Sequence, residues 1–137
     1  YKITTDGNSG VNYRSEQLSD VPNALKGYQA DIDGKNRYTG QNYEERGRTT
    51  LAYRGQKTII NGTENPKAAV KDFVKNNAWT KMDVEKSMNK DSLQNFIKAD
   101  DWNQVHLIIK GNRLQHYVNG VLMSDVIDND KVNNLIY

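Results

Sequence analysis

The chain of 137 residues has the length of one domain, which is too short for an enzyme with a cleft between two lobes. Hydrophobic residues make up 36% and charged residues 26% of the sequence, and eight tyrosines dominate its aromatic residues. This composition is typical of a polar, β-rich domain with a thin core. The net charge is +2 without any basic run longer than two residues, which excludes a nucleic-acid or membrane-surface partner from our expectations.

Cysteine is absent, which excludes iron–sulfur clusters, thiolate zinc sites, a catalytic cysteine and disulfides. His106 and His116 are the only histidines, so a three-histidine zinc site is excluded as well. The sequence does not identify a cofactor; any metal would be a divalent cation held by carboxylates, or by a mixture of His and carboxylate ligands. No stretch of the sequence approaches the roughly 20 apolar residues of a membrane-spanning helix.

Short runs of alternating apolar and polar residues, separated by glycine and asparagine turns, fill the first half of the chain. This rhythm is typical of an all-β sandwich rather than of alternating strands and helices. The predicted strands of this half cover residues 11–15, 27–33, 38–43, 49–54 and 57–60.

The middle of the chain changes to helical spacing. Asn65 suits an N-cap and Pro66 the first position of a helix that carries Val70, Phe73 and Val74. A second apolar triplet at helical spacing consists of Leu93, Phe96 and Ile97. We therefore expect one or two short helices in an excursion over residues 64–100, whereas residues 81–90 are polar and ambiguous.

The C-terminal part has the strongest local signals, because Gly111-Asn112 and Asn119-Gly120 suit two-residue hairpin turns. They predict antiparallel strands over residues 102–110, 113–118 and 121–127. The first turn fixes the register, so the side chains predicted to face the core are Val105, Leu107, Ile109, Leu114 and Val118. His116 lies on the same apolar face, which favours a hydrogen-bonded core histidine over a catalytic base, whereas His106 points the other way.

Two polar segments are candidates for a binding site. Along 27–33 the side chains of Gln29, Asp31 and Asp33 share one face of a strand. This face is either the solvated side of a sheet or a groove for sugar hydroxyls, which amides and carboxylates bind well. Arg14 would join the groove if its strand is a neighbour.

The second segment, residues 43–48, is dense in charge, and a solvated loop is its default interpretation. Glu44 and Glu45 are adjacent, so in an extended chain they face opposite ways. They are therefore a poor pair for ordinary glycoside hydrolysis, which needs two carboxyl groups about 5 to 9 Å apart. One of them can still face Asp31 across a groove.

Five segments together resemble the bacterial 3-keto-disaccharide hydrolase domain family. The more specific ones are residues 8–15 (NSGVNYRS), 27–33 (GYQADID) and 38–48 (YTGQNYEERGR). Residues 101–103 (DWN) and 111–122 (GNRLQHYVNGVL) agree with the closing hairpins of that family. The matches span most of the chain, and the helical excursion is its least diagnostic part.

The resemblance implies an all-β, two-sheet antiparallel jelly-roll sandwich of the concanavalin A-like kind, with one face for carbohydrate. It also implies a bacterial protein that is exported, so we expect a periplasmic or extracellular location. Family members normally have further strands before the Asn-Ser-Gly turn and after the last hairpin. We therefore expect residues 1–137 to form a single jelly-roll domain that lacks terminal strands at both ends.

The activity implied by the resemblance is cleavage of 3-keto-glycosides. A ketone at C3 makes the C2 proton acidic and places the C1 leaving group β to the carbonyl, so elimination followed by hydration breaks the bond. The route needs a base, an electrophile at the enolate oxygen and an acid for the leaving group. The alternatives are a non-catalytic jelly-roll module that binds carbohydrate, and a structural or adhesive surface module.

Chemistry and position in these motifs assign the candidate roles, with a carbohydrate or glycoside as the expected substrate. Arg14 is the candidate for stabilising the enolate. Asp31 and Glu45 are candidates for the base or for ligands of a divalent cation, and His116 is a second candidate base. The candidate substrate-binding residues are Gln29, Tyr43, Glu44, Arg46 and Arg48.

Overall fold

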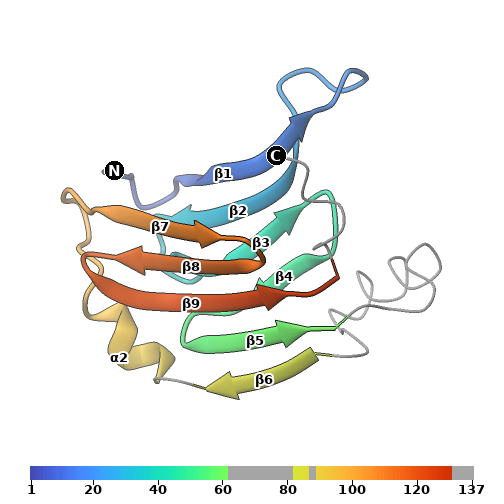
Figure 1. Ribbon diagram of the computed structural model, residues 1–137. Helices are drawn as coiled ribbons and strands as arrows, with labels where there is room; N and C mark the ends of the chain where they lie inside the picture. The colour runs from blue at the N-terminus through green and yellow to red at the C-terminus, as the bar shows by residue number, and fades with distance from the viewer. Residues whose placement is uncertain (62–81, 87–88, 131–137) are drawn as a thin grey trace.

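The computed structural model describes residues 1–61, 82–86 and 89–130. These residues form a β sandwich of two sheets, with one short helix between β6 and β7 (Figure 1). Sheet A contains β1 (Asn8–Gln17), β2 (Leu25–Asp33), β3 (Asn42–Glu45) and β4 (Thr49–Ala52), in this spatial order. Sheet B has the order β6 (Met82–Lys86), β5 (Gln56–Ile60), β9 (Val121–Asp128), β8 (Arg113–Val118), β7 (Val105–Lys110).

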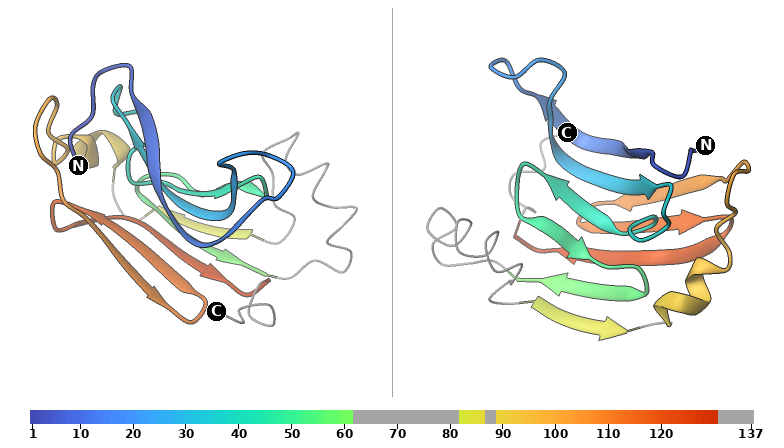
Figure 2. Two further views of the ribbon diagram at one scale, coloured as in Figure 1. Left: turned by 90° about the horizontal axis from the view of Figure 1, so that it is seen from above. Right: turned by 180° about the vertical axis from the view of Figure 1, so that it is seen from behind.

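Neighbouring strands are antiparallel except for β5 and β9, which run parallel at the centre of sheet B. The two sheets lie face to face, as Figure 2 shows from above. The predicted all-β jelly-roll sandwich is therefore confirmed. No helix among the described residues is long and apolar enough to cross a membrane.

The core lies between the sheets in two clusters. The larger cluster joins Tyr28 of β2 and Leu51 of β4 to Leu114 of β8 and Val126 of β9. The smaller one packs Leu93 of α2 (Lys90–Gln94) against Val118 and Met123. Burial of these apolar side chains is the main source of stability for such a sandwich.

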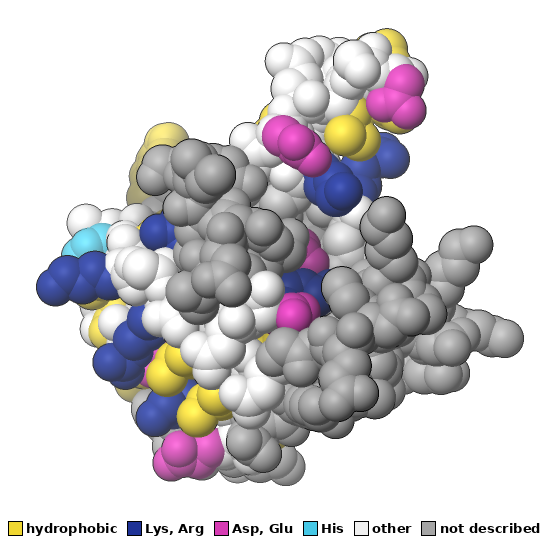
Figure 3. Space-filling view, turned by 45° about the vertical axis from the view of Figure 1, so that its right-hand side comes forward, with side chains coloured by type: hydrophobic (Ala, Val, Ile, Leu, Met, Phe, Trp, Pro, Cys, Tyr) yellow, Lys and Arg dark blue, Asp and Glu magenta, His cyan; other side chains and the backbone are white. Residues whose placement is uncertain are grey.

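The first closing hairpin, β7–β8, has the register that its turn predicts, whereas the register of β8 and β9 shifts by one residue between Tyr117 and His116. Val105 pairs with Val118, Leu107 with His116 and Ile109 with Leu114. The alternation also holds, because Leu114, His116 and Val118 are buried whereas His106, Ile108 and Lys110 on the other face are exposed. Figure 3, in which the outer face of sheet B is turned to the left, shows Lys and Arg side chains among hydrophobic ones.

Three further segments, namely residues 38–43, the polar segment 81–90 and the helix predicted behind Asn65, are compared with the structure as follows. The strand predicted over 38–43 is wrong in its first part, because residues 34–41 form a loop and β3 begins at Asn42. The carboxylate of Asp33 holds this loop by accepting hydrogen bonds from the backbone N–H groups of Arg37, Tyr38 and Thr39. Strand β6 falls in the polar segment that was ambiguous from the sequence. The helix expected behind Asn65 lies outside the described residues.

Candidate functional site

The outer face of sheet A carries a row of polar side chains that crosses all four strands. The register pairs Asn12 with Gln29, Gln29 with Tyr43, and Tyr43 with Thr50. Directly paired residues of a sheet point to the same face. Because Tyr28, next to Gln29, points into the core, this row faces away from sheet B.

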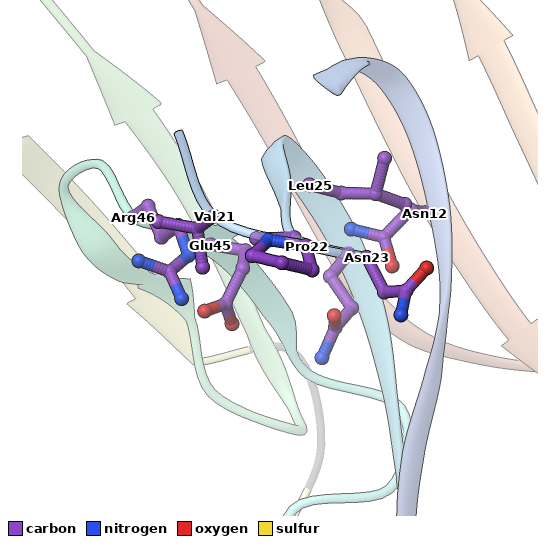
Figure 4. Close-up of a pocket in the computed structure, with 9 residues that line it drawn as sticks. Asn12, Val21, Pro22, Asn23, Leu25, Glu45 and Arg46 are labelled. Carbon is purple, nitrogen blue, oxygen red and sulfur yellow. The ribbon is translucent and has the colours of Figure 1, made fainter. Parts of the chain in front are cut away.

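Two hollows lie side by side on this face, and we call them together the groove. They share Gln29 and Glu45. The tyrosine hollow has a volume of about 390 Å³ and is lined by Asn8, Gln29, Asp31, Tyr38, Gln41, Tyr43, Glu45, Thr50 and Tyr53. The loop hollow, of about 320 Å³, is lined by Asn12, Val21, Pro22, Asn23, Ala24, Leu25, Gln29, Glu45 and Arg46 (Figure 4). Each volume is at the lower end of the range for small-molecule sites.

Asp31 is the central carboxylate of the tyrosine hollow. Its Oδ1 accepts a hydrogen bond of 2.7 Å from Nε2 of Gln29, and its Oδ2 accepts one from Nε2 of Gln41. Burial raises the pKa of Asp31, and the negative charges of Glu45 and Asp33 raise it further, although the two amides act in the opposite direction. The carboxylate is thus fixed in orientation and more basic than an ordinary aspartate.

Glycine at position 10 leaves the space that this arrangement needs. Gly10 pairs with Asp31, and a Cβ atom at Gly10 would lie 2.5 Å from Cγ of Gln29. Real Cβ atoms do not approach a neighbour so closely, so a larger residue would displace Gln29 from the carboxylate of Asp31.

Three tyrosines line the same hollow as this carboxylate. They are Tyr43, Tyr38 and Tyr53, and the last two have exposed fractions of 43% and 38%. Burial raises the pKa of the Tyr43 hydroxyl, and the charges of Glu45 and Asp31 add to this effect, so the hydroxyl stays protonated at neutral pH. Exposed rings beside hydroxyl and amide groups are suited to the apolar and polar sides of a sugar ring.

A family model described as the 3-keto-alpha-glucoside-1,2-lyase-like domain matches residues 1–135. The chain belongs to this family. No curated protein matches the chain. The family match covers both sheets and every residue of the groove.

Five of the predicted site residues line the groove. Asp31 and Tyr43 belong to the tyrosine hollow, Arg46 belongs to the loop hollow, and Gln29 and Glu45 belong to both. Glu45 is close enough to Asp31 for its negative charge to raise the pKa of the Asp31 carboxyl group.

Arg14 does not face the groove, so the expectation that it shares a face with Asp31 is wrong. The register of β1 and β2 shifts between Tyr13 and Glu16, and Arg14 has a φ of +46°. This β-bulge breaks the alternation of side chains along β1. The guanidinium of Arg14 instead donates a hydrogen bond to the carbonyl oxygen of Gly111, in the turn between β7 and β8.

His116 lies between the sheets and not in the groove, with an exposed fraction of 1%. Its Nε2 is 2.8 Å from the hydroxyl of Tyr13, and its Nδ1 is 3.2 Å from the carbonyl oxygen of Gln41. Burial lowers the pKa of His116 to about 4, so the ring is neutral at pH 7. A neutral ring beside a carbonyl must carry its proton on Nδ1, which leaves Nε2 to accept from Tyr13. This buried position removes His116 as a base that touches substrate.

Glu44 and Arg48 are also buried between the sheets, so the expectation that they line the groove is wrong. Nε of Arg48 donates to Oε2 of Glu44 over 2.7 Å, and Nη1 donates to Oδ1 of Asp128 over 3.0 Å. The hydroxyl of Tyr28 donates to the other oxygen of Asp128 over 2.7 Å. These bonds satisfy a buried guanidinium and two buried carboxylates, which would otherwise be very unfavourable.

Several groove residues were not singled out from the sequence. Gln41 belongs to the family-like segment 38–48, and Asn12 occupies the polar face of its strand. These two features could have identified both residues as candidates for the groove. Tyr38, Tyr53 and residues 21–24 reach the groove from loops, whose conformations alternation does not reveal.

The described residues contain no group of three or more His, Asp or Glu side chains arranged to hold a metal ion. Asp31 and Glu45 are the carboxylates of the groove, and both oxygens of Asp31 already accept bonds from amides. No step of the chemistry described below uses a divalent cation.

Proposed function

We propose that this domain cleaves 3-keto-glycosides in the groove of sheet A, by elimination followed by hydration. The observation that carries the proposal is Asp31, a carboxylate of raised pKa that two amides hold in one orientation beside Glu45. Membership of the 3-keto-alpha-glucoside-1,2-lyase-like family supports the same reaction class.

Asp31 acts as the base that removes the proton from C2 of the 3-keto sugar. The electrons of the C–H bond pass into an enolate, the C1–O bond breaks, and a C1=C2 double bond forms. The proton taken by Asp31 returns to the oxygen of the leaving group, with Glu45 as a relay. Water then adds its oxygen to C1 and a proton to C2, which restores the free 3-keto sugar. A raised pKa suits the base, because general bases work best when their pKa approaches the ambient pH.

The enolate oxygen needs a hydrogen-bond donor, and Tyr43 takes the role for which Arg14 was a candidate. Its hydroxyl is protonated at neutral pH because burial and the nearby carboxylates raise its pKa. Gln29 and Gln41 orient Asp31 through their amide groups. A donor aimed at the developing charge typically contributes about 10²-fold or more to the rate.

The direct test is the substitution Asp31→Asn in an assay that follows release of the leaving group from a 3-keto-glucoside. Asparagine keeps the shape of aspartate but cannot take a proton at neutral pH, so we expect kcat to fall by at least about 10²-fold. Circular dichroism of the variant checks that the sandwich is intact.

Full turnover by a folded Asp31→Asn variant would remove Asp31 from catalysis. The second candidate function is carbohydrate binding without catalysis, which the exposed rings of Tyr38 and Tyr53 favour. Wild-type protein that binds a 3-keto-glucoside without cleaving it would establish this second function. We also propose a periplasmic or extracellular location, in keeping with a carbohydrate substrate.

A further inference from the structure

The loop hollow contains a cation for which the proposed reaction has no use. Arg46 lines this hollow and, among the described residues, forms no ion pair within 4 Å. Figure 4 shows the polar ends of Arg46, Glu45 and Asn23 directed to the same side of the sheet. An exposed arginine without a partner in a hollow is available to bind an anionic group.

The backbone holds Arg46 in this position. Arg46 is at the tip of the turn between β3 and β4, with a φ of +54°. On the inner side of the same turn, the backbone N–H of Arg48 donates to Oε2 of Glu44 over 2.6 Å, and the guanidinium binds the same carboxylate. Gly47 packs so closely that a Cβ atom there would lie 2.5 Å from this oxygen. The buried ion pair therefore fixes the turn that presents Arg46.

Two amides complete the polar lining of the hollow. Asn23, with a φ of +57°, lies on the loop between β1 and β2, and Asn12 lies on β1. Nδ2 of Asn12 is buried and has no hydrogen-bond partner among the described residues. This donor is closed off from the hollow, so the exposed guanidinium of Arg46 is the charged donor of the hollow that a ligand can reach.

The charges of the groove are distributed unevenly between its two hollows. Asp31 and Glu45 make the tyrosine hollow negative, whereas the loop hollow contains the opposite charges of Glu45 and Arg46. An anionic substituent is therefore repelled by the first hollow and attracted in the second only by Arg46. The tyrosine hollow therefore suits a neutral 3-keto sugar, and a negative charge on the substrate is tolerated only on the leaving group.

We propose that the loop hollow binds the leaving group of the 3-keto-glycoside and that Arg46 recognises a carboxylate on it. The preferred substrate is thus a 3-keto-glycoside whose leaving group is an acidic sugar of the uronic acid class. This inference rests on the proposed function for the position of the 3-keto sugar, in the tyrosine hollow beside Asp31.

The test compares two 3-keto-glucosides that differ only in whether the leaving sugar is glucuronic acid or glucose. We expect Arg46→Gln to raise KM for the acidic substrate about tenfold more than KM for the neutral substrate, because a charge-assisted hydrogen bond to the carboxylate is lost. Lys110→Gln, which removes an exposed cation from the other sheet, is the control for net charge. Equal changes in KM for both substrates would overturn the inference.

A binding measurement separates this inference from the proposed reaction. Asp31→Asn protein is titrated with the unoxidised glucosyl-glucuronic acid disaccharide, and the amide chemical shifts are followed by NMR. We expect tighter binding than for the glucosyl-glucose disaccharide, and loss of this difference when Arg46→Gln is added. If neither 3-keto substrate is cleaved, the proposed function fails, yet the titration still decides the role of Arg46. Equal affinity for both disaccharides would refute the acidic subsite.

Discussion

Asp31 experiences two opposing influences on its pKa. Burial and the charge of Glu45 raise the pKa, and the amides of Gln41 and Gln29 lower it, with burial as the largest effect and a raised pKa as the result. A general base must be deprotonated to work, so kcat/KM should fall as the pH decreases through this raised pKa. The acidic limb of the pH profile should therefore lie above the value of 3.8 that is ordinary for aspartate.

Neutralising Glu45 should lower the pKa of Asp31. Glu45→Gln removes a negative charge that disfavours ionisation of Asp31, so the pKa of Asp31 should decrease. A pH titration of the Asp31 side-chain carbon by NMR measures this change directly. Glu16→Gln, at an exposed position of β1, is the matched control and should leave the titration of Asp31 in place. An unchanged or increased pKa in Glu45→Gln would mean that the two carboxylates do not interact.

His116 should make the stability of the sandwich depend on pH. Its pKa is lowered by burial from 6.5 to about 4, so the unfolded chain binds a proton more readily than the folded one between these values. The free energy of unfolding should therefore be unaffected above pH 6.5 and decrease as the pH falls toward 4, by up to about 3 kcal/mol. Urea unfolding at a series of pH values measures this slope.

The two histidines allow a matched comparison of that slope. His116→Gln should abolish this contribution to the pH dependence, whereas His106→Gln, at an exposed position of β7, should retain it. If both variants keep the wild-type slope between pH 6.5 and 4, the loss of stability in that range has another origin.

At the scale of elements, the buried ion pair connects the turn after β3 to the end of β9. Arg48 binds Glu44 within the turn and Asp128 on β9. Removing one partner of a buried ion pair leaves uncompensated charge in the core, which typically costs about 3 to 5 kcal/mol. We expect Arg48→Met to lower the free energy of unfolding by this amount, as measured by urea denaturation.

Lys57→Met is the control for this substitution. Lys57 forms a more exposed ion pair with Glu85 at 3.9 Å, and such pairs contribute less than about 1 kcal/mol. Arg48→Lys should restore only part of the stability, because lysine cannot reproduce the several donors of the guanidinium. A cost for Arg48→Met no larger than that for Lys57→Met would show that the ion pair does not anchor the turn.

Local sequence signals predicted the elements whose geometry depends on nearby residues. The turn at Gly111 fixed the register of β7 and β8, whereas the turn at Asn119 fixed only the first pairs of β8 and β9, because a register shift between Tyr117 and His116 follows them. Residues 38–41 were mistaken for a strand, since their loop depends on the carboxylate of Asp33, which alternation does not reveal. Strand β6 has few apolar residues and is defined by its pairing with β5.

The same distinction applies to the groove. Alternation along β2 placed Gln29 and Asp31 together, and adjacency placed Glu44 and Glu45 on opposite faces. Which glutamate faces outward follows from the pairing of β2 with β3, and this pairing is a tertiary property. Arg14 was misplaced because a single bulge reverses the expected direction of a side chain.

At the scale of the whole molecule, sheet A has ionisable groups on both faces, and their environments separate their roles. Glu44, facing inward, is paired with Arg48 and stabilises the sandwich, whereas Asp31 and Glu45, facing outward, line the groove. The inner charges are neutralised by hydrogen-bonded partners, and the pKa of Asp31 is raised. A rigid sandwich thus supports a basic carboxylate on an accessible face.

The central claim is that Asp31 removes the proton from C2, and an isotope experiment in D₂O tests it most directly. Wild-type protein and the Asp31→Asn variant are incubated with a 3-keto-glucoside, and the free 3-keto sugar is analysed by NMR at early times, with enzyme-free substrate as the control for spontaneous exchange. The mechanism predicts that wild-type product carries deuterium at C2 and that Asp31→Asn forms little product. Release of the leaving group with hydrogen fully retained at C2 would contradict the elimination mechanism.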